Sequence, residues 1–206
     1  MLRKQVLVQK MKGLSGNDVY ARCYDKNKSI YIHIPKCAGT SVSKHLYGED
    51  PWHFNWKELR FINKEKFDSY FKFAVVRDPW DRIASTYFYG IKHAKENPRT
   101  KIAFLLDYQN FKDFVKNGIC KNMVDRHYFF WGSCKYIGEG GVDVIKFENI
   151  DKEIKGVFSK IGIGGKLPSE NINKNKINYK DEYDLDMKKK IACLYRDDIE
   201  RFDYEF

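Results

Sequence analysis

Short apolar runs alternate with longer mixed segments along this chain of 206 residues. Residues 30–34, 71–76 and 142–147 are rich in apolar and β-branched side chains, which is typical of buried strands. Residues 79–89, 102–116, 150–161 and 183–201 instead space their apolar positions as helices do. Strands that alternate with helices predict an α/β fold with a parallel sheet flanked by helices, in a single domain preceded by an irregular N-terminal arm over residues 1–28.

The first predicted strand leads into a turn suited to binding an anion. Pro35 ends the apolar run, and an amphipathic helix is expected to begin at Gly39 and continue to residue 46. The first backbone N–H groups of a helix lack internal partners, and the positive end of the helix dipole favours an anion there. Lys36 adds a full positive charge beside this helix start.

The second predicted strand ends in a similar sequence. Arg77 follows residues 73–76, Asp78-Pro79 suits a helix start, and Ser85 lies about two turns into that helix. An arginine guanidinium can bind a phosphate through two parallel hydrogen bonds. Carboxyl ends of parallel strands share one sheet edge, so we expect both anion sites to serve a single ligand. This is not the usual nucleotide-triphosphate loop, in which the lysine follows the second glycine.

Together, "HIPKCAGTS" at residues 33–41 and "FAVVRDPWDRIASTYFY" at residues 73–89 resemble the two nucleotide-binding motifs of sulfotransferases that use 3′-phosphoadenylyl sulfate (PAPS). The resemblance is greatest to the carbohydrate branch and extends from about residue 29 to the C-terminus, so residues 29–206 would be the sulfotransferase domain, with a sheet like that of P-loop nucleotide-binding proteins. It implies that the phosphosulfate is held by the first loop, Lys36, Cys37, Ala38, Gly39, Thr40 and Ser41. It also implies that Arg77 and Ser85 bind the 3′-phosphate, and that a basic segment with Lys174 and Lys176 can act as a lid.

Sulfuryl transfer needs a base to accept the proton of the acceptor hydroxyl, and Lys36 is placed to stabilise the charge on the leaving phosphate. We expect His53 to be the base, because "HFNWKEL" at residues 53–59 resembles the H-x-T-A-x-E-L segment of the family. His127 is the second candidate. It lies in "DRHYFFW", where this chain departs from the family pattern, and the aromatic side chains there suit a sugar face or a phenol. The resemblance to the carbohydrate branch makes a saccharide hydroxyl the expected acceptor. The reaction needs no metal, and we expect none.

Charge and composition narrow the classes of partner. The net charge is +10, but residues 181–206 carry nine acidic and five basic side chains, so the positive charge is concentrated before them. This distribution favours a polyanionic ligand. The sequence contains no nucleic-acid-binding motif, so we expect no nucleic-acid partner. Five cysteines without a C-x-x-C pair, no secretory leader and no membrane-length apolar run favour a cytoplasmic protein.

Two other functions are compatible with the motifs. A kinase-like phosphotransferase would bind ATP with magnesium, and a non-catalytic relative would hold a nucleotide or glycan without turnover. The sequence indicates neither the oligomeric state nor the sulfated position.

Overall fold

The structure is a computed structural model that describes residues 3–165 and 178–206. The described residues form two compact units. The first unit contains the residues up to Val76 and those from Lys135 to Gly165, and the second contains Arg77–Cys134 and the residues from Asn178 onward.

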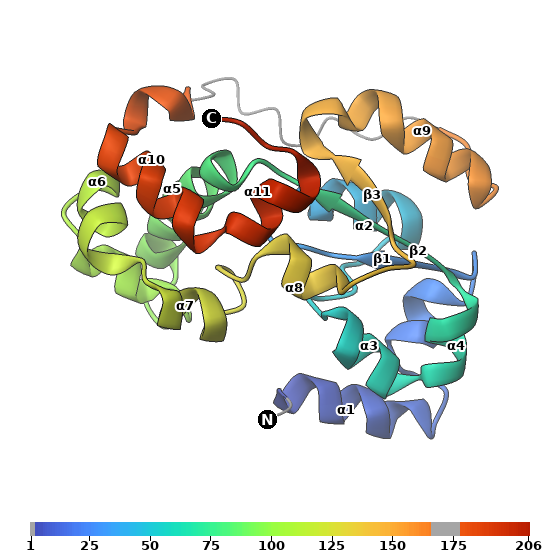
Figure 1. Ribbon diagram of the computed structural model, residues 1–206. Helices are drawn as coiled ribbons and strands as arrows, with labels where there is room; N and C mark the ends of the chain where they lie inside the picture. The colour runs from blue at the N-terminus through green and yellow to red at the C-terminus, as the bar shows by residue number, and fades with distance from the viewer. Residues whose placement is uncertain (1–2, 166–177) are drawn as a thin grey trace. The chain divides into compact units, whose positions relative to one another are not determined.

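A parallel sheet forms the centre of the first unit (Figure 1). Its strands are β1 (Ser29–Ile32), β2 (Phe71–Val76) and β3 (Asp143–Lys146), in the order β1-β2-β3. Every residue of β1 and the last four of β2 are buried, as expected where helices flank a parallel sheet. The predicted α/β class and all three strands are therefore confirmed.

Helices surround this sheet within the first unit. The π-helical segment η1 packs on β1, α9 packs on β3, and α1, α3 and α4 lie together (Figure 1). The elements are α1 (Lys4–Gly13), η1 (Tyr20–Tyr24), α2 (Gly39–Tyr47), α3 (Trp56–Ile62), α4 (Lys64–Ser69), η4 (Phe147–Asn149) and α9 (Ile150–Lys160). The start of α2 agrees with the predicted helix start at Gly39.

The N-terminal arm is helical, so the prediction of an irregular arm is wrong. Its apolar side chains are too few to show helical spacing clearly in the sequence, yet Val6, Val19 and Tyr20 are fully buried. The Tyr20 hydroxyl donates a hydrogen bond to the Leu59 carbonyl at 3.0 Å. Tertiary burial, rather than local periodicity, fixes this segment.

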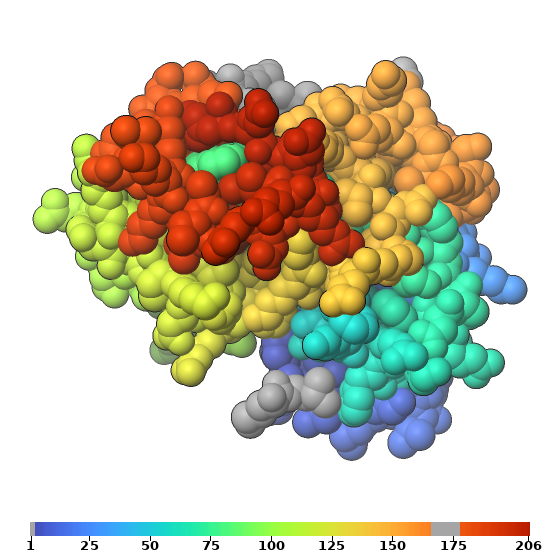
Figure 2. Space-filling view, in the orientation of Figure 1, coloured from blue at the N-terminus to red at the C-terminus, as the bar shows by residue number. Residues whose placement is uncertain are grey.

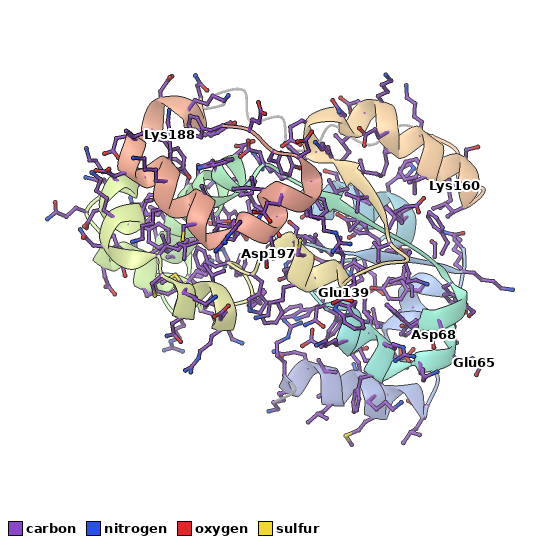
Figure 3. The ribbon with its side chains drawn as sticks, in the orientation of Figure 1. Glu65, Asp68, Glu139, Lys160, Lys188 and Asp197 are labelled. Atoms are coloured by element: carbon purple, nitrogen blue, oxygen red, sulfur yellow. The ribbon has the colours of Figure 1, made fainter. Side chains whose placement is uncertain are left out.

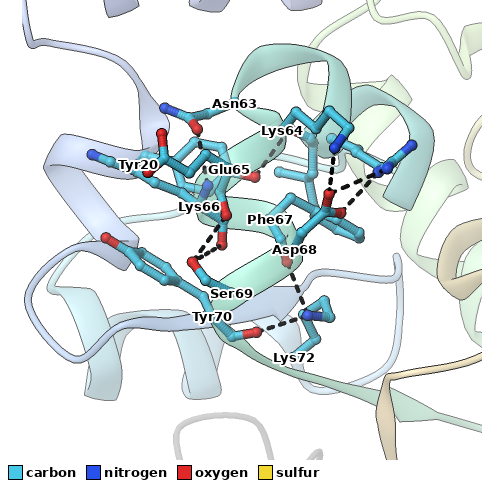
Figure 4. Close-up of polar contacts among 12 residues, drawn as sticks. Tyr20, Asn63, Lys64, Glu65, Lys66, Phe67, Asp68, Ser69, Tyr70 and Lys72 are labelled. Carbon is cyan, nitrogen blue, oxygen red and sulfur yellow. Dashed lines mark hydrogen bonds and ion pairs between the residues drawn. The ribbon is translucent and has the colours of Figure 1, made fainter.

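A lysine closes the connection between α4 and β2 (Figure 4). The Lys72 ammonium group donates to the carbonyl oxygens of Phe67 at 2.9 Å and Tyr70 at 2.8 Å. These carbonyls lie at the end of α4, where backbone acceptors lack helical partners. The side chain therefore holds the chain in the turn that leads directly into β2.

Helices make up the second unit. Its longest helix, α5, runs over Pro79–Glu96. The others are η2 (Ala103–Asp107), α6 (Phe111–Asp113), η3 (Phe114–Gly118), α7 (Lys121–Arg126), η5 (Tyr179–Glu182), α10 (Leu185–Leu194) and α11 (Arg196–Phe202), while α8 (Ser133–Ile137) begins in this unit and continues into the first. Within this unit α10 packs on α5, and α10 and α11 lie at the surface on the face shown in Figure 2.

The C-terminal residues attach to α5 through one turn of α10. The carbonyl of Lys188, a residue labelled in Figure 3, accepts the indole N–H of Trp80 at 3.1 Å. The Lys188 ammonium group lies 3.9 Å from the centre of the Phe206 ring. The ring of Phe206 in turn packs edge-on against Trp80. The last residue of the chain is thus part of the packing around α5.

Two predicted helices are each broken in the structure. Residues 102–116 form η2, α6 and part of η3, because Tyr108 is extended and Asn110 begins a new helix by accepting the N–H of Asp113. The predicted helix over residues 183–201 is interrupted at Tyr195, between α10 and α11. The Tyr195 hydroxyl donates to the Phe130 carbonyl at 2.7 Å, a contact that sequence periodicity does not reveal.

Within the residues that the structure describes, no helix combines the length and the apolar character needed to cross a bilayer.

The buried hydroxyl of Tyr195 predicts a measurable contribution to stability. Tyr195→Phe leaves the Phe130 carbonyl without this donor, so we expect the free energy of unfolding to fall by about 1–2 kcal/mol. Tyr108→Phe is the control, since among the described residues the Tyr108 hydroxyl has no hydrogen-bond partner. Urea unfolding would measure both, and equal stability of the two variants would contradict the assignment.

Candidate active site

The loop between β1 and α2 has a strained backbone. Lys36 and Ala38 adopt left-handed conformations with φ of 64° and 57°, which residues other than glycine rarely do. Cys37, between them, is fully buried, and its carbonyl accepts the Tyr31 hydroxyl at 3.3 Å. Cys37 therefore contributes packing and backbone to the loop. Backbone strain of this kind persists where surrounding contacts enforce it, and it gathers at functional sites.

The helix that follows this loop begins without a side-chain cap. Ala38 occupies the N-cap position and has no side-chain acceptor for the first N–H groups of α2. Gly39, Thr40 and Ser41 form the first turn, and Lys36 is half-buried at its start. An uncapped helix start with a nearby cation is favourable for binding an anion such as a phosphate.

Gly39 packs directly against a histidine from the end of β1. A methyl group added at Gly39 would lie 1.7 Å from Nε2 of His33, so no other residue fits without displacing the imidazole. His33 itself is 4% exposed. The close approach holds the imidazole against the first turn of α2.

His33 is also part of a cluster with two residues from the segment after α2. Its Nδ1 lies 2.9 Å from Oδ1 of Asp50, which also accepts the backbone N–H of Trp52 at 2.8 Å. The ring centres of His33 and His53 are 4.1 Å apart. One strand end, one helix start and one loop therefore bring an anion cradle and two imidazoles together within the first unit.

The hydrogen bonds of His53 define the tautomer of its neutral ring. Nδ1 of His53 lies 3.0 Å from the His33 carbonyl oxygen, which can only accept, so Nδ1 carries the proton and Nε2 keeps its lone pair. Burial, reinforced by the electrostatic influence of His33, lowers the pKa of His53 to about 3. The imidazole is thus neutral near pH 7, in the form that a general base requires.

Asp50 remains ionised over the same range. Burial alone would raise the pKa of this carboxyl group, but the hydrogen bond to His33 and the Trp52 N–H outweigh it and lower the pKa to about 2. A carboxylate beside an imidazole fixes the orientation of the ring and stabilises its protonated form. Asp50 therefore fixes the ring of His33 while His33 packs on Gly39.

The same three side chains form a possible ligand set for a metal ion. His33, Asp50 and His53 each offer one nitrogen or oxygen atom, and these atoms all lie within 4.8 Å of one another. Imidazoles with a carboxylate are ligands that zinc-class ions accept. Catalysis without a metal ion therefore stays a prediction.

In the second unit, an aspartate holds the predicted phosphate-binding arginine. Nε and Nη2 of Arg77 donate to the two carboxylate oxygens of Asp81 at 2.9 and 2.8 Å. Both side chains are 11% exposed. The paired geometry fixes the plane of the guanidinium.

The start of α5 differs from that of α2. The Asp78 carboxylate accepts the N–H groups of Trp80 at 2.8 Å and Asp81 at 3.1 Å, so these amides are already satisfied. The Tyr179 hydroxyl donates to the other oxygen of Asp78 at 3.1 Å. The two motifs therefore differ, and a phosphate at this motif would depend on side chains, as predicted for Arg77 and for Ser85, which is half-buried.

The remaining predicted residues fall into two groups. Lys174 and Lys176 lie outside the described residues. His127, in the second unit, directs Nε2 to the Lys101 carbonyl at 3.2 Å, and its Nδ1 is buried and has no hydrogen-bond partner among residues 3–165 and 178–206. Burial also lowers the pKa of His127. With one ring nitrogen bound to the backbone and the other enclosed, His127 is poorly placed to accept a proton from a substrate.

Sequence reasoning missed three residues of the cluster around His53. His33 lies in an apolar run, where a structural role is the simpler interpretation, and Asp50 precedes Pro51 in a pattern typical of a turn. Arg3, in the N-terminal arm, binds the backbone carbonyl of His53 across a separation of 50 residues. The glycine at Gly39 was the available signal for His33, because a helix-start glycine indicates close approach of another group.

The low pKa of His53 predicts that stability depends on pH. An unfolded chain protonates histidine near pH 6.5, whereas native His53 stays neutral down to about pH 3. The unfolded state binds the extra proton in this window, so stability falls as the pH is lowered from 6.5, by at most about 1.4 kcal/mol per pH unit from this group. Urea unfolding between pH 4 and 7 should show a steeper slope for the wild type than for His53→Asn. Parallel slopes would contradict a depressed pKa.

Comparison with known proteins agrees with the motifs. A sequence model of the sulfotransferase family matches residues 21–205, which include both anion motifs and the His53 segment. No curated protein and no solved structure gives a significant match. Because the family match extends over nearly the whole chain, this protein belongs to the sulfotransferase family.

Proposed function

We propose that this protein transfers a sulfuryl group from PAPS to a hydroxyl group of a carbohydrate, with His53 as the general base. Membership of the family supports sulfuryl transfer in general. The donor, the acceptor class and the base are inferences from the motifs and from the cluster in the first unit.

One observation carries the proposal. The uncapped start of α2 lies against His33, whose ring is 4.1 Å from that of His53. The group that would hold the sulfuryl donor and the group that would accept a proton thus belong to one compact cluster. In-line displacement requires a nucleophile and its base on one side of the sulfur and a stabilised leaving group on the other.

The first loop suits the phosphosulfate end of PAPS. Its backbone N–H groups at Gly39, Thr40 and Ser41 and the Lys36 ammonium group would bind the anionic oxygens, with Cys37 and Ala38 shaping the backbone. We assign the 3′-phosphate to Arg77, with Ser85 as a further donor. Lys174 and Lys176 remain candidates for additional contacts.

The bound donor would supply an activated sulfuryl group with a phosphate leaving group. Nε2 of neutral His53 would accept the proton of the acceptor hydroxyl as the new S–O bond forms. Lys36 and the amides of α2 would stabilise the negative charge that develops on the leaving oxygen. Protonation would convert His53 into a cation, which the neighbouring Asp50 carboxylate and a bound polyanion would both stabilise.

Transfer of labelled sulfate would test the function directly. [³⁵S]PAPS would be incubated with the purified protein and separate acceptors, namely desulfated heparin, chondroitin, free oligosaccharides and 2-naphthol. We expect label on a saccharide. Label only on the phenol would overturn the carbohydrate assignment. No transfer to any acceptor, together with intact binding of adenosine 3′,5′-bisphosphate, would indicate a non-catalytic relative.

Arg77→Ala should weaken binding of adenosine 3′,5′-bisphosphate. The variant loses a charge-assisted contact to the 3′-phosphate, which corresponds to about 1.5–3 kcal/mol. The exposed Arg99→Ala is a matched control that removes the same charge from the same unit. Calorimetric titration would measure both, with adenosine 5′-monophosphate as a second ligand that lacks the 3′-phosphate. Equal losses for both ligands would argue against the assignment.

His53→Ala should slow transfer without changing donor binding. Loss of a general base reduces turnover by roughly 10²–10⁴-fold, while the loop that holds the donor is retained. The control is His93→Ala, in the second unit. Single-turnover rates with the acceptor found in the transfer screen would test the effect. A fully active His53→Ala variant would exclude His53 as the base.

A further inference from the structure

Arg3 contacts three residues of the segment that carries His53, namely His53, Phe54 and Glu58. Its Nη2 donates to the His53 carbonyl oxygen at 2.5 Å and also to Oε2 of Glu58, and its Nε donates to Oε1 of Glu58 at 2.6 Å. The centre of the guanidinium lies 5.8 Å from the Phe54 ring. A single planar side chain therefore contacts the beginning, middle and end of residues 53–58.

Glu58 links this contact to the start of α3. Its carboxylate accepts the Asn55 N–H at 3.0 Å, while the Asn55 side chain accepts the Glu58 N–H, which completes a capping box. The Glu58 side chain is 6% exposed, and a carboxylate buried to this extent needs a partner charge. Arg3 supplies that charge and at the same time binds the backbone of His53.

The helix that begins directly after Arg3 makes a second contact with the same segment. The Lys10 ammonium group donates to the carbonyl of Ile62, the last residue of α3, at 3.0 Å. Helix α1 (Lys4–Gly13) thus contacts α3 near both of its ends. Both Arg3 and Lys10 precede residues 21–205, which the family model matches, so the family match does not account for them.

We propose that Arg3 is a positioning residue for the general base, fixing the backbone of His53 while the His33 carbonyl fixes its ring. This inference rests on the proposed function of His53. The His33 carbonyl binds Nδ1 of His53, and Arg3 binds the backbone carbonyl of His53. Because the ring and the backbone are both held, the direction in which Nε2 points is also fixed. A small displacement of a catalytic group can lower the rate by about 10²-fold. Arg3 can therefore affect the rate of transfer without touching the substrate.

A set of variants separates positioning from general stability. Arg3→Met removes the charge and the hydrogen bonds, whereas Arg3→Lys keeps a charge for Glu58 but cannot form the paired contact and reach His53 together. Lys4→Met is the control, because Lys4 is exposed and next in sequence. Each variant would be assayed for unfolding by urea, binding of adenosine 3′,5′-bisphosphate and sulfate transfer from [³⁵S]PAPS to the acceptor found in the screen.

We expect Arg3→Met to reduce the single-turnover rate by about 10- to 100-fold, with nucleotide affinity within about twofold of the wild type. Arg3→Lys should recover stability but not the full rate, and Lys4→Met should match the wild type. A wild-type rate in Arg3→Met would overturn the proposal. A rate loss matched by an equal loss of nucleotide affinity would also overturn it, because that result indicates general disruption.

Amide hydrogen exchange gives a readout that does not depend on catalysis. Arg3 binds the His53 carbonyl and the Glu58 carboxylate, which completes the capping box with Asn55. Exchange at the Asn55 and Glu58 amides should therefore be faster in Arg3→Met and unchanged in Lys4→Met. Unchanged exchange in Arg3→Met would contradict the proposed contact. If the wild type transfers no sulfate, the proposed function fails, but this measurement still tests the contact.

Discussion

The absence of a side chain at Gly39 is the constraint on which the first unit's site depends. With Nε2 of His33 only 1.7 Å from where a β-carbon would lie, the imidazole is held against the start of α2. Asp50 binds Nδ1 of the same imidazole, and the ring of His53 packs beside it. The loop proposed to bind the phosphosulfate and the candidate base are therefore held together by one close approach.

The two anion motifs use different physical means. At α2 the N-cap residue is Ala38, which leaves the first amides without a side-chain acceptor. At α5 the Asp78 carboxylate already satisfies the corresponding amides, and Asp81 orients Arg77. The first motif thus offers backbone dipoles, which suit an anion whose charge changes during reaction. The second offers an oriented guanidinium, which suits a phosphate that is only bound.

The sequence predicted those elements whose positions depend on neighbouring residues alone. The three strands, the start of α2 and the start of α5 follow from apolar runs, glycine and proline, and the structure has them. The breaks at Tyr108 and Tyr195 depend on a new helix cap and a hydrogen bond to Phe130, which periodicity does not register. The contact between Arg3 and His53 spans 50 residues and has no local signature. The sequence does show that Glu58 stands at a capping-box position after Asn55. It does not show that Glu58 is buried and therefore needs a cationic partner.

The central claim is that the chain recognises a nucleotide with a phosphate on the 3′ side of its ribose. Calorimetric titration with adenosine 3′,5′-bisphosphate, and separately with ATP and magnesium, tests it most directly. The account predicts that the bisphosphate binds without magnesium and about tenfold or more tightly than ATP, since ATP lacks the 3′-phosphate. Tighter binding of ATP that requires magnesium would contradict the account and indicate a phosphotransferase instead.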